Sequence, residues 1–379
     1  MASQSQQSSW VILGTAPRVA AAGELQAGAS VALARATPPR LAHLTVAPTV
    51  FPSDPDPQAR IASPRARPPT RARLCRGPDG VERTIHVSRA PRPAYFVLDV
   101  PSAAAARVPG AGDLFAAGLG VLAEPAGRSG YMVVDLQIIV GGKEATLACF
   151  ASEAGDWVEK DVRNPRPHWM WSFDDVVSHG GRVWWVDCAE GILSCDPFAD
   201  RPEMAYVPLP KGSGGHGGGE GGHGSCGYCT RRSLASHRRV QASAGKFHCV
   251  EVGCASQGGA PRITMFTLDD PETAEWTPKC AMDFSGIWDC HSYKAAGLPN
   301  KAPEVALIHP GHFFSLHMAT KEVLECEADE DGAIASSCSC ALAWELPPTL
   351  TSDPRYEFDA TCLLPWATSH SEVVCLRRY

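Results

Sequence analysis

Two adjacent tryptophans in a strand-like run constrain this chain most. Residues 181–187 read Gly-Arg-Val-Trp-Trp-Val-Asp, and a second apolar run at 192–196 follows after a short turn. Because successive side chains of a strand point to opposite faces of a sheet, Trp184 and Trp185 must point in opposite directions. A strand that buries an indole on each face is an inner strand in stacked sheets. The segment therefore predicts a hairpin between two packed layers.

Paired strand-like runs recur along the chain. Two apolar runs joined by a short turn are found in segments 131–150, 183–196, 240–252 and 305–326. Trp157 and Trp276 follow two of these hairpins at corresponding places. A unit of about 50 residues that contains one small antiparallel sheet is typical of a β-propeller blade. We therefore predict an all-β fold, either a β-propeller or a propeller-like array of small antiparallel sheets.

Composition divides the chain into three parts. We expect N-terminal strands of the β body in 1–58, an Arg/Pro-rich flexible segment in 59–92, and the propeller-like body in 93–379, with a glycine-rich inserted loop at 211–229. The 32 prolines and 35 glycines are consistent with a protein that has many turns.

Short apolar runs bounded by proline or glycine predict further strands at 10–13, 41–46 and 95–99. Helix is expected at one place, residues 113–122, where Ala, Leu and Phe cluster between a glycine and a proline.

Charge and hydropathy exclude two classes of partner. The formal net charge is −7, whereas contacts to nucleic-acid phosphates need a basic surface, so a general nucleic-acid binder is not expected. No apolar run approaches the roughly 18 residues of a membrane span, so no membrane partner is expected either.

The chain has 15 cysteines, and its first residues lack the basic and apolar regions of a signal peptide. We therefore expect an intracellular protein, cytoplasmic or nuclear and not secreted, whose thiols are reduced. Cys149, Cys188, Cys249 and Cys375 lie in apolar runs, where a thiol behaves as a small hydrophobic side chain.

Taken together, ten pieces of the sequence form a known pattern. They are residues 10–13, 41–52, 95–99, 181–198, 207–210, 243–247, 266–269, 287–288, 293–294 and 307–310. With these pieces the chain resembles the plant proteins classed under domain of unknown function 1618. The resemblance implies a propeller-like β fold similar to F-box-associated and kelch-type domains, and it supplies no reaction and no catalytic residues. The chain departs from the family at 59–85, where arginine and proline replace a glycine- and leucine-rich strand region.

The glycine-rich loop contains four potential zinc ligands. Cys226 and Cys229 have the CxxC spacing that suits tetrahedral coordination, and His216 and His223 precede them. However, a glycine tract loses much conformational entropy when it closes around a metal, and no second CxxC follows. We prefer an unstructured insertion and assign no metal ligands.

The same loop superficially matches a hydrolase. The motif at 216–219 resembles an esterase oxyanion loop, and Ser225 lies in a near match to a nucleophile elbow. An elbow needs glycine at the position of His223, a strand before the serine and a helix after it, so we reject this interpretation.

Other candidate side chains have ordinary structural explanations. The acid pairs Asp174-Asp175 and Asp269-Asp270 lie where turns are expected, and Asp commonly accepts backbone hydrogen bonds there. His309 ends an apolar run and has no identifiable nucleophile partner. Core and inter-blade packing, not a ligand cage, is the expected role of Trp157, Trp171, Trp184, Trp185, Trp276 and Trp288.

The first functional hypothesis is therefore a non-enzymatic protein-binding module whose loops recognise another protein, with no cofactor. A hydrolase or lyase with a site at the propeller mouth is one alternative. Weak nucleic-acid binding through the nine arginines of 59–92 is the other, although a solvated linker is the preferred interpretation of that segment.

Overall fold

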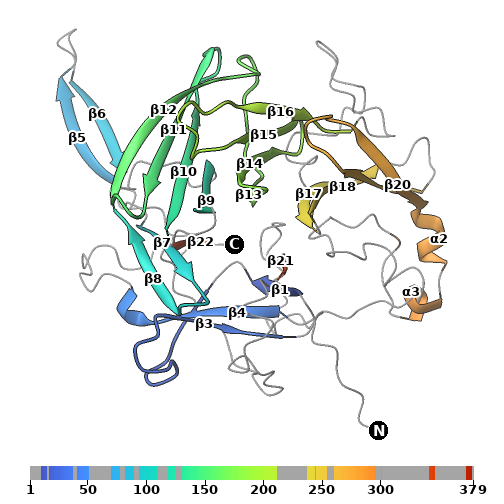
Figure 1. Cartoon of the computed structure of the whole chain (residues 1–379), viewed down its shortest axis with the longest axis horizontal. Coiled ribbons are helices and arrows are strands. Elements are labelled where there is room, and N and C mark those ends of the chain that lie inside the picture. Colours follow the sequence, from blue (N-terminus) through green and yellow to red (C-terminus); the bar gives the residue numbers. More distant parts are fainter. Residues whose placement is uncertain are drawn as a thin grey trace.

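The structure of the protein is a computed structural model (Figure 1). The residues that it describes are 10–14, 17–36, 41–50, 70–76, 82–88, 94–109, 118–124, 130–210, 237–243, 245–253, 260–289, 291–295, 300, 341–345 and 373–377. The expected hairpin at 305–326 and the glycine-rich loop at 211–229 lie outside them.

Three four-stranded antiparallel sheets follow one another along the chain. We call them sheets 3, 4 and 5, because sheets 1 and 2, described below, begin closer to the N-terminal end. Sheet 3 contains β9 (Leu119–Ala123), β10 (Tyr131–Ile138), β11 (Glu144–Ala151) and β12 (Asp156–Arg163). Sheet 4 contains β13 (Asp175–His179), β14 (Arg182–Asp187), β15 (Gly191–Cys195) and β16 (Ala205–Pro208). Sheet 5 contains β17 (Arg238–Ser243), β18 (Lys246–Gly253), β19 (Arg262–Leu268) and β20 (Trp276–Asp283). The hairpins predicted at 131–150, 183–196 and 240–252 are confirmed as β10–β11, β14–β15 and β17–β18.

The three sheets are arranged side by side, like the blades of a propeller. In Figure 1, β9, β13 and β17 lie on the inner side of the array, whereas β12, β16 and β20 lie farther out. The inner strands of neighbouring sheets contact one another, β9 with β13 and β13 with β17. The predicted fold class, an all-β propeller-like array, is confirmed.

Two further sheets combine strands that are far apart in the sequence. Sheet 1 contains β1 (Trp10–Gly14), β2 (Arg18–Val19), β3 (Val31–Ala34), β4 (Leu41–Val46) and β21 (Ala341–Glu345). Sheet 2 contains β7 (Ala94–Asp99), β8 (Ala104–Val108) and β22 (Val373–Arg377). Strand β21 pairs antiparallel with β1, and β22 pairs parallel with β7. The strands predicted at 10–13, 41–46 and 95–99 are confirmed, and strands near the C-terminal end complete both sheets.

A hairpin that the sequence analysis missed lies within the Arg/Pro-rich segment. Strands β5 (Thr70–Arg76) and β6 (Glu82–Ser88) pair antiparallel as a two-stranded sheet of their own. Their sequences alternate larger apolar residues with polar ones, as in Ile85-His86-Val87-Ser88, which is the period of a strand. The abundance of arginine and proline in 59–92 concealed this alternation.

The expected helix at 113–122 is wrong where the structure describes it. Residues 119–122 belong to strand β9, which pairs with β10 through Val121 and Val133. Strand β9 is buried on both faces, and such a strand has a continuous apolar run that periodicity alone cannot distinguish from a buried helix.

Short helices occur instead at η1 (Pro48–Val50), α2 (Phe284–Trp288) and α3 (His291–Ala295). Among the described residues, no helix combines the length and the apolar character needed to cross a membrane.

The apolar core lies between consecutive sheets, and the two adjacent tryptophans join it from opposite faces of β14. Trp185 packs with Val134 and Leu147 between sheets 3 and 4. Trp184 packs between sheets 4 and 5, where its ring centroid lies 4.7 Å from that of Phe247. Gly120 permits the close approach of β9 to sheet 4, because a Cβ there would lie 2.6 Å from a methyl carbon of Val183. The two-layer prediction from residues 181–187 is confirmed.

Cysteines fill small spaces in this core. Cys149, Cys188, Cys195 and Cys249 are free and buried. Burial raises the pKa of the Cys149 thiol to about 11 and the pKa of the Cys249 thiol to about 12, so both remain protonated at neutral pH. The packing role predicted for Cys149, Cys188 and Cys249 is confirmed, and the side chain of Cys375 lies outside the described residues.

Candidate functional site

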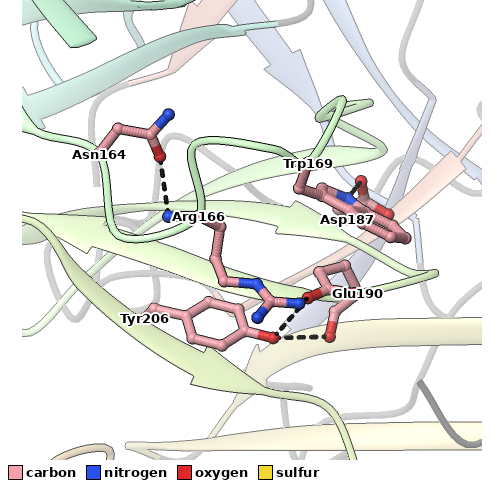
Figure 2. Close-up of polar contacts among 6 residues, drawn as sticks. All are labelled: Asn164, Arg166, Trp169, Asp187, Glu190 and Tyr206. Atoms are coloured by element: carbon pink, nitrogen blue, oxygen red, sulfur yellow. Dashed lines mark hydrogen bonds and ion pairs between the residues drawn. The ribbon is translucent and has the colours of Figure 1, made fainter. Parts of the chain in front are cut away.

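Three connecting segments meet at one edge of sheets 3 and 4, and we call this region the loop edge. It consists of the β10–β11 turn (139–143), the β12–β13 connection (164–174) and the β14–β15 turn (188–190). Strands β10 and β12 both flank β11 antiparallel, so both end at this edge. Figure 2 shows the polar contacts that hold the β12–β13 connection against sheet 4.

Backbone hydrogen bonds fix the β12–β13 connection to the β10–β11 turn. The backbone N–H of Asn164 donates to the carbonyl oxygen of Lys143 at 2.8 Å, and its side-chain amide donates to the carbonyl of Gly142 at 3.2 Å. The N–H of Gly141 donates to the carbonyl of Pro167 at 2.6 Å. Gly141 has φ of 88°, a left-handed conformation that favours glycine. The two loops therefore form one connected surface.

Arg166, Glu190 and Tyr206 link the connection to sheet 4 (Figure 2). The guanidinium of Arg166 forms an ion pair with the Glu190 carboxylate and lies over the Tyr206 ring, 5.4 Å from its centroid. The Tyr206 hydroxyl donates to Glu190 Oε1 at 3.0 Å. Burial, and next the negative charge of Glu190, raises the pKa of Tyr206. The phenol therefore remains protonated and acts as a hydrogen-bond donor.

Asp187 holds the middle of the same connection. Its side chain is buried at the end of β14, and Oδ2 accepts hydrogen bonds from the Trp169 indole and from the backbone N–H of Ser172, each at 3.1 Å. Oδ1 accepts from the N–H of Ala189 at 2.9 Å. One buried carboxylate thus satisfies donors from the connection and from the β14–β15 turn.

Buried acids occupy comparable places in the neighbouring sheets. Asp135 of β10 lies opposite Leu119, the first residue of β9, and Glu251 of β18 lies opposite Arg238, the first residue of β17. In sheet 4, Val186 pairs with Asp175, the first residue of β13, and Asp187 is the next residue after Val186. In each sheet the acid therefore lies where the chain enters the inner strand.

The carboxylate of Glu251 has a charged partner. Arg238 Nη2 donates to Glu251 Oε2 at 2.6 Å, with both side chains buried, and Nη1 donates to the carbonyl of Cys188 at 3.2 Å. This ion pair therefore joins sheet 5 to the β14–β15 turn of sheet 4.

Three exposed apolar side chains lie on the segments of the loop edge. Ile139 is 76% exposed, Val140 55% and Met170 63%, and the first two lie on the turn that is bonded to the β12–β13 connection. We call these three residues the edge patch. Among the described residues, the other exposed large apolar side chains are Val19 and Val158, which lie on β2 and β12. Because backbone hydrogen bonds hold both of its loops, the edge patch is a fixed surface.

One family model matches part of the chain. Residues 185–320 match the family model described as a protein of unknown function (DUF1618). Over these residues the chain is similar to the DUF1618 family. The resemblance predicted from the sequence is thereby confirmed over these residues, which begin in β14 and include sheet 5. No curated protein and no solved structure matches the chain.

Several sequence candidates fall in the DUF1618 segment but outside the described residues, namely His216, His223, Ser225, Cys226, Cys229 and His309. Within the part of the chain that the structure describes, no three His, Cys, Asp or Glu side chains are grouped so that they could hold a metal ion.

The acid pairs accept hydrogen bonds, as the turn interpretation predicts. Asp174 Oδ2 accepts from the N–H of Cys188 at 2.8 Å, and Asp270 Oδ1 accepts from the N–H of Glu272 at 3.0 Å. Asp175 and Asp269 have basic partners, Arg239 at 3.1 Å and Lys246 at 2.7 Å. The structure does not bring the two pairs together in one site, because Asp174 and Asp175 lie at the start of sheet 4 and Asp269 and Asp270 in the β19–β20 turn.

The tryptophans pack within and between sheets. The indole N–H of Trp157 donates to the carbonyl of Pro109, after β8, at 2.7 Å. That of Trp276 donates to the carbonyl of Pro208, at the end of β16, at 2.8 Å. Each therefore joins an outer strand to the preceding sheet, as expected of a structural repeat. Trp171 and Trp288 pack against the apolar clusters of sheets 3–4 and sheet 5.

Sequence reasoning missed the Arg166–Glu190–Tyr206 contacts and the edge patch. Nothing in the spacing of these three polar residues indicates that they meet, since tertiary packing brings them together. The edge patch left a signal, because the apolar run of β10 continues through Ile139 and Val140 into a Gly-Gly turn.

Proposed function

We propose that this protein is a non-enzymatic protein-binding module that recognises its partner through the edge patch. The observation that carries the proposal is the exposure of Ile139, Val140 and Met170 on two loops fixed by backbone hydrogen bonds. Apolar side chains that remain exposed on loops are available for recognition, and rigid scaffolds position such loops. Methionine suits such a surface because its unbranched side chain adapts to irregular partners.

The polar groups near the patch support a binding role over a catalytic one. Glu190 is already paired with Arg166 and Tyr206, and both oxygens of Asp187 accept backbone or indole hydrogen bonds. A general acid or base needs a proton that it can exchange with a substrate, and these groups are engaged in holding the loops. Their role in the proposal is to keep the surface in a fixed shape.

We further propose that the protein acts inside the cell, in the cytoplasm or the nucleus. Five free cysteines among the described residues, including the half-buried Cys280, are compatible with a reducing compartment.

Affinity purification with matched variants tests the proposal. The tagged full-length protein is expressed in plant cells beside two double variants, Val140→Ser/Met170→Ser in the patch and Val19→Ser/Val158→Ser elsewhere. Val140 and Val158 are both 55% exposed, so these two substitutions remove similar apolar surface, whereas Met170 is 63% and Val19 45% exposed. Co-purifying proteins are quantified by mass spectrometry, and melting temperatures confirm that both variants fold.

We expect a reproducible partner that the wild type and the Val19→Ser/Val158→Ser control retain and the patch variant loses. A partner retained equally by all three forms would place recognition elsewhere and contradict the role of the patch. No reproducible partner of the wild type would contradict the binding module itself.

A further inference from the structure

We propose that the β5–β6 hairpin is a second binding site, which contacts the phosphates of double-stranded DNA through a face that carries three arginines. This inference goes beyond the proposed function, because the hairpin shares no residue with the edge patch. It is carried by the charge of residues 59–92 and by the register in which β5 pairs with β6.

The hairpin belongs to a strongly basic segment of an acidic protein. Residues 59–92 contain nine arginines, no lysine and two acids, which is a formal net charge of +7, whereas the whole chain has −7. The net charge of the chain argues against a general nucleic-acid surface, but a dense local group of cations still creates a positive field around itself. Arginine is the cation that binds phosphate best, because its planar guanidinium donates two parallel hydrogen bonds.

Three of these arginines share one face of the hairpin. Residues directly opposite each other in an antiparallel pair lie on the same face, and so do residues two positions apart on one strand. The register therefore places Arg71 and Arg73 of β5 on the same face as Arg83 of β6. Among the paired positions of the two strands, this face has no aspartate or glutamate, and we call it the arginine face. Its other positions are Cys75, Ile85 and Val87.

The opposite face of the hairpin has a different charge pattern. It carries one arginine, Arg76, which lies opposite the one acid of the two strands, Glu82. Opposite charges at facing positions of a sheet attract each other. The unbalanced positive charge of the paired strands is therefore on the arginine face, and Arg76 is a reference position on the same strand.

The hairpin also has a shape that suits duplex DNA. Strands β5 and β6 form a two-stranded sheet of their own, and in Figure 1 they extend outward from the array, on the outer side of β12. The major groove of B-form DNA is about 12 Å wide and admits a two-stranded β-ribbon. In that groove arginine donates to phosphates and to guanine, and aliphatic residues such as Ile85 and Val87 suit the methyl group of thymine.

Other nucleic acids fit this segment less well. Proteins that bind single strands stack the bases on aromatic rings, and residues 59–92 contain no Phe, Tyr or Trp. The major groove of double-stranded RNA is deep and narrow, so side chains cannot read it. The arginine face is therefore assigned to duplex DNA.

Binding of labelled DNA tests this assignment. A short fluorescent duplex of random sequence is titrated with the full-length protein at several salt concentrations, and fluorescence anisotropy gives the dissociation constant. The wild type is compared with Arg73→Ala, Arg73→Lys, Arg83→Ala and Arg76→Ala. Because Arg73 and Arg76 lie on opposite faces of β5, Arg76→Ala removes the same charge from the wrong face. Hydrogen exchange within β5 and β6 checks that each variant keeps the hairpin.

We expect Arg73→Ala to weaken binding at least about fivefold and to reduce the slope of log K against log salt by about one, because one phosphate contact is lost. Arg83→Ala should act in the same way from the other strand, which covers the case in which one substitution loosens the hairpin. Arg73→Lys keeps the charge and should keep the salt slope. Arg76→Ala should weaken binding less than about twofold.

Three results would overturn the inference. Equal losses in Arg73→Ala, Arg83→Ala and Arg76→Ala would show that the arginine face has no special role. No salt-dependent binding of duplex DNA by the wild type would exclude the site. Tighter binding of polyglutamate, single-stranded RNA or anionic lipid vesicles than of the duplex would assign the hairpin to that ligand and not to DNA. All of these measurements are independent of the edge patch, so they leave the proposed function to its own test.

Discussion

Strand β14 and the edge patch are both apolar, yet they have opposite environments. Trp184 and Trp185 are buried on opposite faces of a strand that has a paired strand on each side and a sheet over each face. Ile139 and Val140 continue the apolar run of β10 but come after its last paired residue, Ile138, and remain exposed. Apolar residues are thus buried where hydrogen-bonded strands and covering sheets enclose them. Beyond the end of the ladder, the same residue types remain exposed to solvent.

The largest effect is expected from Trp185→Ala, which tests the buried side of this comparison. The indole is buried between sheets 3 and 4 and donates its N–H to the carbonyl of Gly118 at 2.7 Å. Its removal leaves a cavity, so the free energy of unfolding should fall by about 4 kcal/mol. Met170→Ala at the patch should change it by less than about 0.5 kcal/mol. Urea denaturation measures both, and a similar loss in the two variants would contradict the distinction.

A smaller but substantial effect is expected from Glu251→Ala. This substitution leaves the Arg238 guanidinium buried without its carboxylate, so the free energy of unfolding should fall by about 3 kcal/mol. The double variant Arg238→Met/Glu251→Leu removes both charges and should recover most of that loss. If the double variant is as unstable as Glu251→Ala, packing and not charge pairing is the main contribution of these side chains.

The next effect concerns the loop edge itself. Asp187→Ala leaves the N–H groups of Ser172 and Ala189 without their acceptor, and the free energy of unfolding should fall by about 2 kcal/mol. Asp187→Asn keeps one acceptor oxygen and should lose less. Because the connection carries Met170, Asp187→Ala should also increase hydrogen exchange within residues 164–174. Unchanged exchange there would show that other contacts hold the connection.

The smallest effect is expected at an exposed ion pair of sheet 5. The hydrogen bond from Lys246 lowers the pKa of Asp269, so Lys246→Ala should raise that pKa toward its ordinary value. Lys279→Ala should raise it less, because Lys279 Nζ lies 3.8 Å from the carboxylate and Lys246 Nζ 2.7 Å. NMR titration of the side-chain carboxyl carbon measures both.

The sign of the linked pH effect follows from the lowered pKa. The Lys246–Asp269 pair favours the folded state above the unfolded pKa of Asp269, and this contribution is lost as the pH falls through the lower, folded pKa. Both groups are exposed, so neither variant should change the melting temperature measurably. A clear destabilisation in Lys246→Ala would contradict the contrast with Arg238 and Glu251.

One hairpin in each of sheets 3, 4 and 5 could be predicted from the sequence. These sheets are formed by consecutive strands, so turn signals such as Gly141-Gly142 and local apolar runs define the hairpins β10–β11, β14–β15 and β17–β18. The pairing of β1 with β21 and of β22 with β7 joins residues more than 270 positions apart. Local pattern contains no information on such pairing, and these partners were not predicted.

The candidate site was predictable to a smaller extent. The sequence indicated that Asp174 accepts a backbone hydrogen bond at a turn, but not that Asp187 satisfies donors from two loops. Arg166 and Glu190 lie 24 positions apart on different connections, so only the folded arrangement of sheets 3 and 4 brings them together. The helix expected over 119–122 failed because an inner strand buried on both faces lacks the alternation that identifies a strand.

Site-specific photo-crosslinking at the loop edge tests the central claim most directly. A photoreactive amino acid is placed at position 170 in one form and at position 158 in another, and the tagged chain is irradiated in cells that express it. The account predicts a discrete crosslinked protein at position 170 that is absent at position 158 and is lost when Val140→Ser is added. The same crosslinked protein at both positions, or at position 158 alone, would contradict recognition through the edge patch.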